Sequence, residues 1–187
     1  MRRIVAMVVI PPLLFLIGVK SLSAQELHGQ AAIPTPTPQR EEIHYILPYP
    51  GMLPDNPLYP IKIVRDRLLL FFTRDPLRRI ALEIHLSDKY LVMGKSLGDR
   101  QMYDFAISTF FKGEMYLSSA VKSYEKLKQN NNAPPGLIEN LETATKKHEQ
   151  VLEDFMFSIT NQTKKDSLEG ILNSTRETKE KIISLKE

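Results

Sequence analysis

The sequence predicts an all-α protein, an antiparallel helical bundle built from long helical hairpins and preceded by a proline-rich extended arm. Apolar residues after residue 60 recur at alternating three- and four-residue steps, which is the spacing of one helix face. No run alternates apolar and polar residues with the period of two that a strand shows. Eight of the 13 prolines lie between residues 34 and 60, so regular helix is excluded there and favoured beyond it.

The composition excludes several classes of function. Three of the 25 basic residues lie in residues 1–24, which contain no acid, so the rest of the chain carries 22 charges of each sign. A neutral chain lacks the main electrostatic attraction to nucleic acid, and no nucleic-acid partner is expected. The absence of cysteine excludes thiol nucleophiles, disulfides, cysteine-ligated zinc and a lipidated cysteine anchor.

Residues 1–24 are predicted to be a signal peptide. Arg2 and Arg3 precede an uninterrupted apolar run over residues 4–19, and small residues then allow a cut after Ser23 or after Ala24. The alternative is an uncleaved membrane anchor, although a span takes roughly 20 apolar residues. The prediction is an extracytoplasmic protein, secreted or in the cell envelope after cleavage, and membrane-anchored if the signal is uncleaved.

Two segments of different character follow the signal. Residues 25–42 are polar and rich in proline and threonine, which predicts an extended linker. Residues 43–60 are rich in tyrosine, leucine and isoleucine, so we expect an ordered arm that docks on an apolar surface. Its tyrosines, Tyr45, Tyr49 and Tyr59, favour a structural clasp over one end of the bundle, with an aromatic ligand groove as the alternative.

The predicted bundle spans residues 61–160. Asp55 or Asn56 with Pro57 should cap a first helix over Ile61–Phe72, whose last residues are apolar on every side and therefore buried or pressed on a partner. Asp75-Pro76 should start the second helix. The second and third helices carry apolar seams that include small residues and would let them approach closely: Leu77, Ile80, Ile84, Ser87, Leu91 and Gly94, then Tyr103, Ala106, Phe110, Gly113, Leu117, Ala120, Tyr124 and Leu127.

Two more helices are predicted after a loop at residues 130–136. The fourth has a full seam, which consists of Ile138, Leu141, Thr145, His148, Leu152, Phe155 and Ile159. A capping box at Thr163 and Asp166 should start the last helix, within residues 161–187. Its seam of Leu168, Ile171, Thr175, Thr178, Ile182 and Leu185 is thin, so we expect this helix to pack loosely, to fray or to wait for a partner.

One stretch of the chain resembles a known family signature. It contains Pro50, Gly51, Leu53, Pro54, Asp55, Pro57, Leu58, Tyr59 and Lys62, followed by Asp75 and Pro76 and the sequence SDKYL at residues 87–91. Over residues 47–90 this resembles an uncharacterised domain-of-unknown-function family of exported bacterial proteins, with the pattern PGxLPDxPLYxxK … DPxKKAELxLxxADKRL. Arg78 and Arg79 stand where that family usually has lysine, and Ser87 where it has alanine. The resemblance implies an extracytoplasmic helical protein with no agreed activity.

Two sets of residues are candidates for binding chemistry. His85, Asp88 and His148, with Glu149 nearby, are weak candidates for a metal site, and a hydrogen-bonded core histidine is the commoner arrangement. No cofactor is predicted. Six basic residues against two acids give residues 61–79 a local charge of +4, for an anionic contact or simply a solvated face: Lys62, Arg65, Arg67, Arg74, Arg78 and Arg79.

No catalytic motif is assembled in the sequence. Ser119 with Lys122 and Ser123 with Lys126 match Ser-x-x-Lys, but none of the companion motifs is present. We therefore predict a non-enzymatic structural, adaptor or binding module of the cell envelope. Its partner would be an envelope protein, or a second copy through the helical seams. The alternative is a binder of anionic envelope polymer or lipid head groups through residues 62–79.

Overall fold

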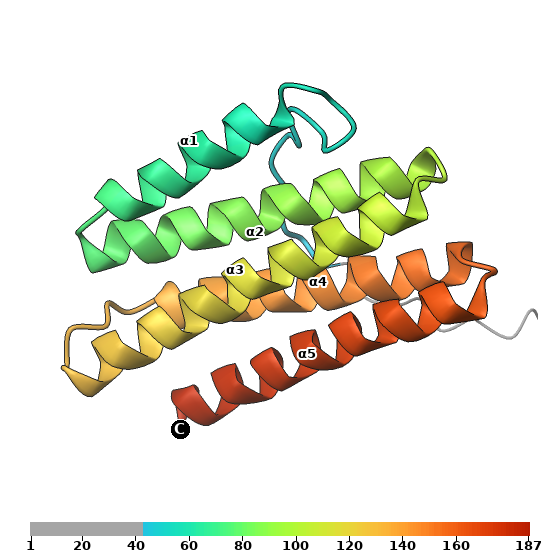
Figure 1. Cartoon of the computed structure of the whole chain (residues 1–187). Helices are drawn as coiled ribbons and strands as arrows, with labels where there is room; N and C mark the ends of the chain where they lie inside the picture. The colour runs from blue at the N-terminus through green and yellow to red at the C-terminus, as the bar shows by residue number, and fades with distance from the viewer. Residues whose placement is uncertain (1–42) are drawn as a thin grey trace, which may run out of the picture. The chain divides into compact units, whose positions relative to one another are not determined.

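In a computed structural model, residues 43–187 are described, and they form five helices and no strand (Figure 1). The helices are α1 (Tyr59–Phe72), α2 (Pro76–Asp99), α3 (Tyr103–Gln129), α4 (Leu137–Ser158) and α5 (Gln162–Lys186). The all-α prediction is confirmed. The predicted signal peptide (1–24) and linker (25–42) lie outside the described residues. Within residues 43–187 no helix is long and apolar enough to cross a membrane.

Helices α2 to α5 form two hairpins that pack on each other. α2 and α3 run antiparallel with the most extensive contact of any pair, and α5 packs against both α3 and α4 (Figure 1). α1 differs from these helices because its main helix contact is with α2 alone. The bundle core therefore lies among α2–α5, and α1 is mounted on one side of it.

The close approach of α2 and α3 depends on the small residues that the sequence placed on their seams. A Cβ atom added at Gly94 would lie 2.6 Å from the ring of Phe110. One added at Gly113 would lie 3.2 Å from the backbone oxygen of Ser87. Larger side chains at either glycine would push the helices apart, so the predicted role of these positions is confirmed.

Two predicted helix starts are wrong by about one half-turn. α1 begins at Tyr59 with Pro60 in its first turn; Asn56 instead accepts a hydrogen bond from the Leu58 backbone N–H (2.9 Å) in the preceding turn. α5 begins at Gln162, because Asn161 caps it by accepting from Lys164 N–H (3.1 Å). The predicted start of α2 is correct, since the Asp75 side chain accepts from Arg78 N–H at 2.7 Å.

α5 is packed along most of its length, contrary to the expectation of a loose last helix. Its buried side chains are Leu168, Ile171, Leu172, Thr175, Thr178 and Ile182. Leu172 adds an apolar residue that the predicted seam omitted. Thr178 donates its hydroxyl to Ser174 O at 2.9 Å, which lets its methyl group pack without leaving a polar atom unpaired.

The arm before α1 crosses behind α2 (Figure 1) and touches the bundle at separate points. Leu53 and Tyr59 are buried in the core, whereas Tyr45 donates a hydrogen bond to Asp88 on α2 at 2.7 Å. Tyr49 points to solvent. The three tyrosines therefore do not line one aromatic groove, and Tyr45 and Tyr59 attach the arm to the bundle.

Candidate functional site

The most unusual surface of the described chain is the side of α1 that faces away from the bundle. We call this surface the outer face of α1; its apolar members are Ile61, Val64, Leu68, Phe71 and Phe72. All five are between 50% and 77% exposed. Because a helix advances about 100° per residue, they form a continuous stripe roughly 100° wide. The aromatic rings of Phe71 and Phe72 meet edge to face, with their centroids 5.3 Å apart.

The opposite side of α1, which packs on α2, carries charge. Lys62 is only 8% exposed and Asp66 only 3%, and their charged groups lie 3.4 Å apart. The Lys62 ammonium sits near the rings of Tyr59 and Tyr90, at 5.3 and 5.1 Å from their centroids. Burial lowers the pKa of Lys62, and the carboxylate of Asp66 opposes that shift. α1 is therefore amphipathic with its apolar side outward.

The predicted anionic contact is only partly assembled. Lys62 faces the bundle and cannot meet an external anion, which corrects the prediction for that residue; a count of charges along the chain does not tell which face they occupy. Arg65 binds Asp66 at 2.7 Å, and Arg79 lies 3.3 Å from Glu83.

Three of the six basic residues remain available. Arg67, Arg74 and Arg78 are exposed and form no ion pair with any other residue in the described range. Arg67 precedes Phe71 by one helical turn, Arg74 lies in the α1–α2 turn, and Arg78 lies in the first turn of α2. Uncompensated positive charge therefore borders the outer face of α1.

The residues of the family-like stretch hold α1 in this position. Leu53 and Tyr59 are buried in the core cluster, and Asp55 pairs with Arg100 at the end of α2 at 3.0 Å. Gly51 has a φ of +72°, a conformation that favours glycine. Asp75 caps α2. These contacts fix both ends of the segment that carries α1.

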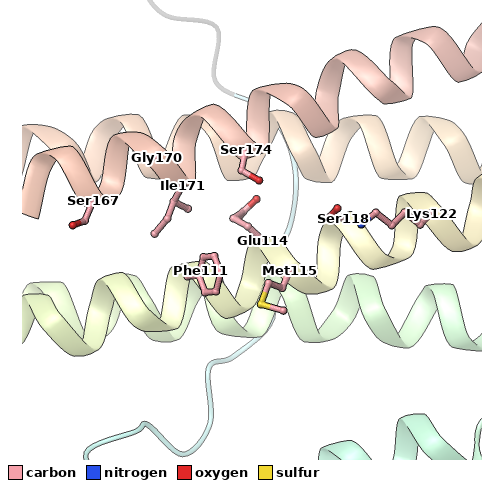
Figure 2. A pocket seen from close by; sticks show the side chains of 9 residues that line it. All are labelled: Phe111, Glu114, Met115, Ser118, Lys122, Ser167, Gly170, Ile171 and Ser174. Carbon is pink, nitrogen blue, oxygen red and sulfur yellow. The ribbon is translucent and has the colours of Figure 1, made fainter.

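Two grooves adjoin the α3 surface. One, of about 480 Å³, lies between α1, α2 and α3; Tyr90 and Tyr116 are among its walls, and Arg67, Arg79 and Lys112 also line it. The second, of about 420 Å³, lies between α3 and α5 (Figure 2). In Figure 2, Phe111 and Met115 on α3 stand opposite Ser167 and Ile171 on α5. Phe111 and Met115 belong to both grooves and are more than half exposed.

A buried charged cluster occupies the centre of the bundle. The His148 side chain on α4 has no exposed surface; its Nδ1 lies 2.6 Å from Glu114 Oε1 on α3, and its Nε2 lies 3.1 Å from Asp88 Oδ1 on α2. The second carboxylate oxygens are also used. Tyr45 of the arm donates to Asp88 Oδ2 at 2.7 Å, and Thr175 of α5 donates to Glu114 Oε2 at 2.8 Å. Four helices and the arm therefore meet at one network.

The electrostatics of this cluster favour a charged histidine. Burial by itself would lower the pKa of His148, but the charge of Glu114 and hydrogen bonds to both carboxylates outweigh it and raise the pKa to about 9. The imidazolium then donates both N–H groups, one to each carboxylate. Burial, followed by the charge and hydrogen bond of Asp88, raises the pKa of Tyr45, which stays a neutral donor.

The candidate metal set is not assembled. His85 is exposed on α2, and both ring nitrogens of His148 are occupied by carboxylates. Glu149 pairs with Arg176 and Lys179 on α5. Among residues 43–187 no group of three histidine, cysteine, aspartate or glutamate side chains is placed to hold a metal ion.

Sequence reasoning missed the buried acids Asp66, Glu83 and Glu114. Glu83 accepts hydrogen bonds from Ser119 (2.9 Å) and Ser123 (3.2 Å), so the serines of the two Ser-x-x-Lys matches serve this carboxylate. Each partner is supplied by a different helix, at a sequence separation that periodicity does not detect. The only available signal was a polar side chain next to a seam position, and most such residues are solvated.

Comparison with known proteins gives one match. A family model described as a domain of unknown function (DUF5667) matches residues 51–182, which is more than half of the chain. No curated protein and no solved structure matches it. The family match covers all of α1–α4 and most of α5, and it agrees with the resemblance to an uncharacterised domain family. The protein is therefore a member of the DUF5667 family, whose defining domain has no established function.

Proposed function

We propose that the protein is an exported, non-enzymatic module of the cell envelope that binds its partner through the outer face of α1. The observation that carries the proposal is the direction of the apolar stripe on α1, which points away from the bundle. A contiguous apolar surface bordered by charge is typical of an interaction site. The opposite face of the same helix is fastened to the body by Lys62 and Asp66, so the stripe is presented on a fixed support.

The rest of the bundle supports a partner at α1 over a partner at the helical seams. The seams of α2–α5 face one another and are filled: Ile80, Leu117, Leu141 and Ile182 have no exposed surface. Self-association or adaptor binding through those seams would require the bundle to open. A partner at α1 would bind without any such change.

A non-enzymatic role is supported by the state of the reactive side chains. A general base needs a nitrogen or oxygen within reach of a substrate. Both nitrogens of His148 are used within the bundle, and Ser119 and Ser123 are bonded to Glu83. Export rests on residues 1–24 of the sequence, where a basic start precedes an apolar run and a small-residue cleavage site.

The test is site-specific photocrosslinking in the producing cells, with the reactive group at Phe71 and a matched control at Phe157. Phe157 is 86% exposed near the end of α4, far from α1 in sequence. We expect abundant adducts with one envelope component from position 71 and few from position 157. Equal yields at both positions, or no adduct at either, would contradict the proposal. An N-terminus at Ala24 or Gln25 supports cleavage, and an intact Met1 indicates that the apolar segment serves as an anchor.

A second candidate is an anionic ligand at residues 62–79, and the unpaired arginines favour it. Arg67, Arg74 and Arg78 are the residues positioned for such a contact. Replacing all three with glutamine should reduce retention in the envelope fraction while leaving the helical circular dichroism unchanged. Unchanged retention would contradict this candidate.

A further inference from the structure

We infer that the outer face of α1 docks on the surface of an anionic phospholipid membrane, with the helix lying parallel to it. The inference rests on the proposed function and names the class of its partner. A lipid surface offers an apolar layer directly beneath a layer of negative charge. α1 and the following turn present an apolar stripe bordered by positive charge, so the two surfaces match in both respects.

The geometry fits a helix that lies in the interface and does not cross it. α1 has 14 residues, about 21 Å of helix, whereas a span needs roughly 20 apolar residues. The charged pair Lys62 and Asp66 lies on the side fastened to α2 and is kept away from lipid. Phe71, Phe72 and Leu68 can enter the acyl boundary while the body remains outside, which is the depth typical of interfacial helices.

The charges favour a membrane over a second copy of the chain. The only acid in α1 is Asp66, which is buried, so the outer face itself carries no negative charge. A two-fold dimer joined through this face would bring Arg67, Arg74 and Arg78 of both copies together, and like charges would oppose it. An anionic leaflet attracts the same arginines, and each contributes roughly fivefold in affinity near such a surface.

The experiment uses the fact that the chain contains no tryptophan. Phe71→Trp places a single fluorescent probe on the outer face, and Phe157→Trp is the matched control on an exposed phenylalanine elsewhere. Each full-length variant is mixed with vesicles of phosphatidylcholine alone, or of equal parts of phosphatidylglycerol and phosphatidylcholine. Any vesicle binding through the apolar N-terminal run affects both variants equally, so the comparison isolates α1.

We expect the Phe71→Trp emission to shift to the blue with phosphatidylglycerol vesicles, and brominated lipid to quench it, while Phe157→Trp emission stays unchanged. Replacing Arg67, Arg74 and Arg78 with glutamine should weaken this vesicle binding at least tenfold, and added salt should weaken it further. Leu68→Glu should abolish the shift in the Phe71→Trp background while leaving thermal unfolding unchanged, because Leu68 is half exposed.

Three outcomes would overturn the inference. An absent shift with a crosslink from position 71 to an envelope protein leaves the proposed function standing and replaces the membrane with a protein partner. An absent shift without any crosslink rejects both. A blue shift without vesicles that grows with protein concentration assigns the outer face to a second copy.

Discussion

α1 and α5 are opposite solutions to the same problem of attaching an outer helix to a bundle. α5 turns its apolar residues inward against α3 and α4, and its charges form ion pairs with neighbouring helices. α1 turns Lys62 and Asp66 inward and leaves its apolar stripe in solvent. The difference teaches that the phase of a helix relative to its support decides what it buries, whatever its overall hydrophobicity.

The two helices should therefore differ in local stability. α5 is held by six buried side chains and by the hydrogen bond from Thr175 to Glu114. α1 buries only Tyr59, Lys62 and Asp66 and contacts mainly one helix. Regions with few buried apolar contacts open most easily, so amide exchange should be faster in α1 than in α5.

Removing the histidine at the centre of the bundle should have the largest effect, and it tests the attachment of α5. His148→Ala leaves Asp88 and Glu114 buried and facing each other without the cation between them. We expect the free energy of unfolding to fall by about 3–5 kcal/mol, measured by urea denaturation. The matched control is His85→Ala, which removes an exposed histidine and should change stability by less than about 0.5 kcal/mol. Equal effects of the two substitutions would contradict the role of the buried cluster.

The same cluster predicts a dependence of stability on pH. The pKa of His148 is raised from 6.5 to about 9 in the folded chain. The protonated form is therefore favoured by folding, and its contribution is complete below pH 6.5 and is lost as pH rises toward 9. We expect the free energy of unfolding to decrease by roughly 3 kcal/mol across this window. The urea midpoint measured against pH checks it. The His85→Ala variant should keep the dependence, and a flat profile in both proteins would contradict a charged His148.

A direct comparison of the two faces comes from truncating one apolar side chain in each helix. Ile182 on α5 has no exposed surface, whereas Phe71 on α1 is largely exposed. Ile182→Ala should lower the free energy of unfolding by about 2–4 kcal/mol because it leaves a cavity. Phe71→Ala should change it by less than about 0.5 kcal/mol. Thermal denaturation measures both, and a large loss for Phe71→Ala would show that the outer face is used within the chain.

The number and order of the helices follow from the sequence, since the 3-4 spacing and the proline breaks act locally. The pairing of α2 with α3 also follows, because Gly94 and Gly113 mark where two backbones must come close. The start of α2 is predicted correctly by Asp75-Pro76. The starts of α1 and α5 are missed because other residues, Pro60 and Asn161, were equally able to begin a helix.

The packing of the outer helices and the buried cluster did not follow from the sequence. Periodicity shows that a helix has two faces, but only the positions of the other helices decide which face is covered. Asp88, Glu114 and His148 come from three helices and are brought together by the fold. The apolar end of α1 was correctly read as buried or pressed on a partner only in the sense that one of these must hold; the structure leaves it exposed, and the partner is a proposal.

The attachment of α1 can be weakened from its inner side. Lys62→Met removes the ammonium that faces Asp66 while keeping most of the side-chain volume. The carboxylate of Asp66 then has only Arg65 as a cationic partner, and we expect α1 to open more easily by about 1–2 kcal/mol. Hydrogen exchange of the α1 amides measures this, with Arg67→Met as the exposed control. Faster exchange across the whole bundle, and not in α1 alone, would contradict the separate attachment of this helix.

The smallest expected effect concerns the ion pairs on the outside of α5. Arg176 binds Glu149 at 3.1 Å and Glu153 at 2.8 Å, but its side chain is 45% exposed. Solvent screens such pairs, so Arg176→Ala should lower the free energy of unfolding by no more than about 1 kcal/mol. The loss should shrink further in high salt. If it instead approached the loss expected for Ile182→Ala, the surface charges would carry the attachment of α5, and the contrast with α1 would lie in electrostatics. A small, salt-sensitive loss in urea denaturation leaves burial as the term that separates the two helices.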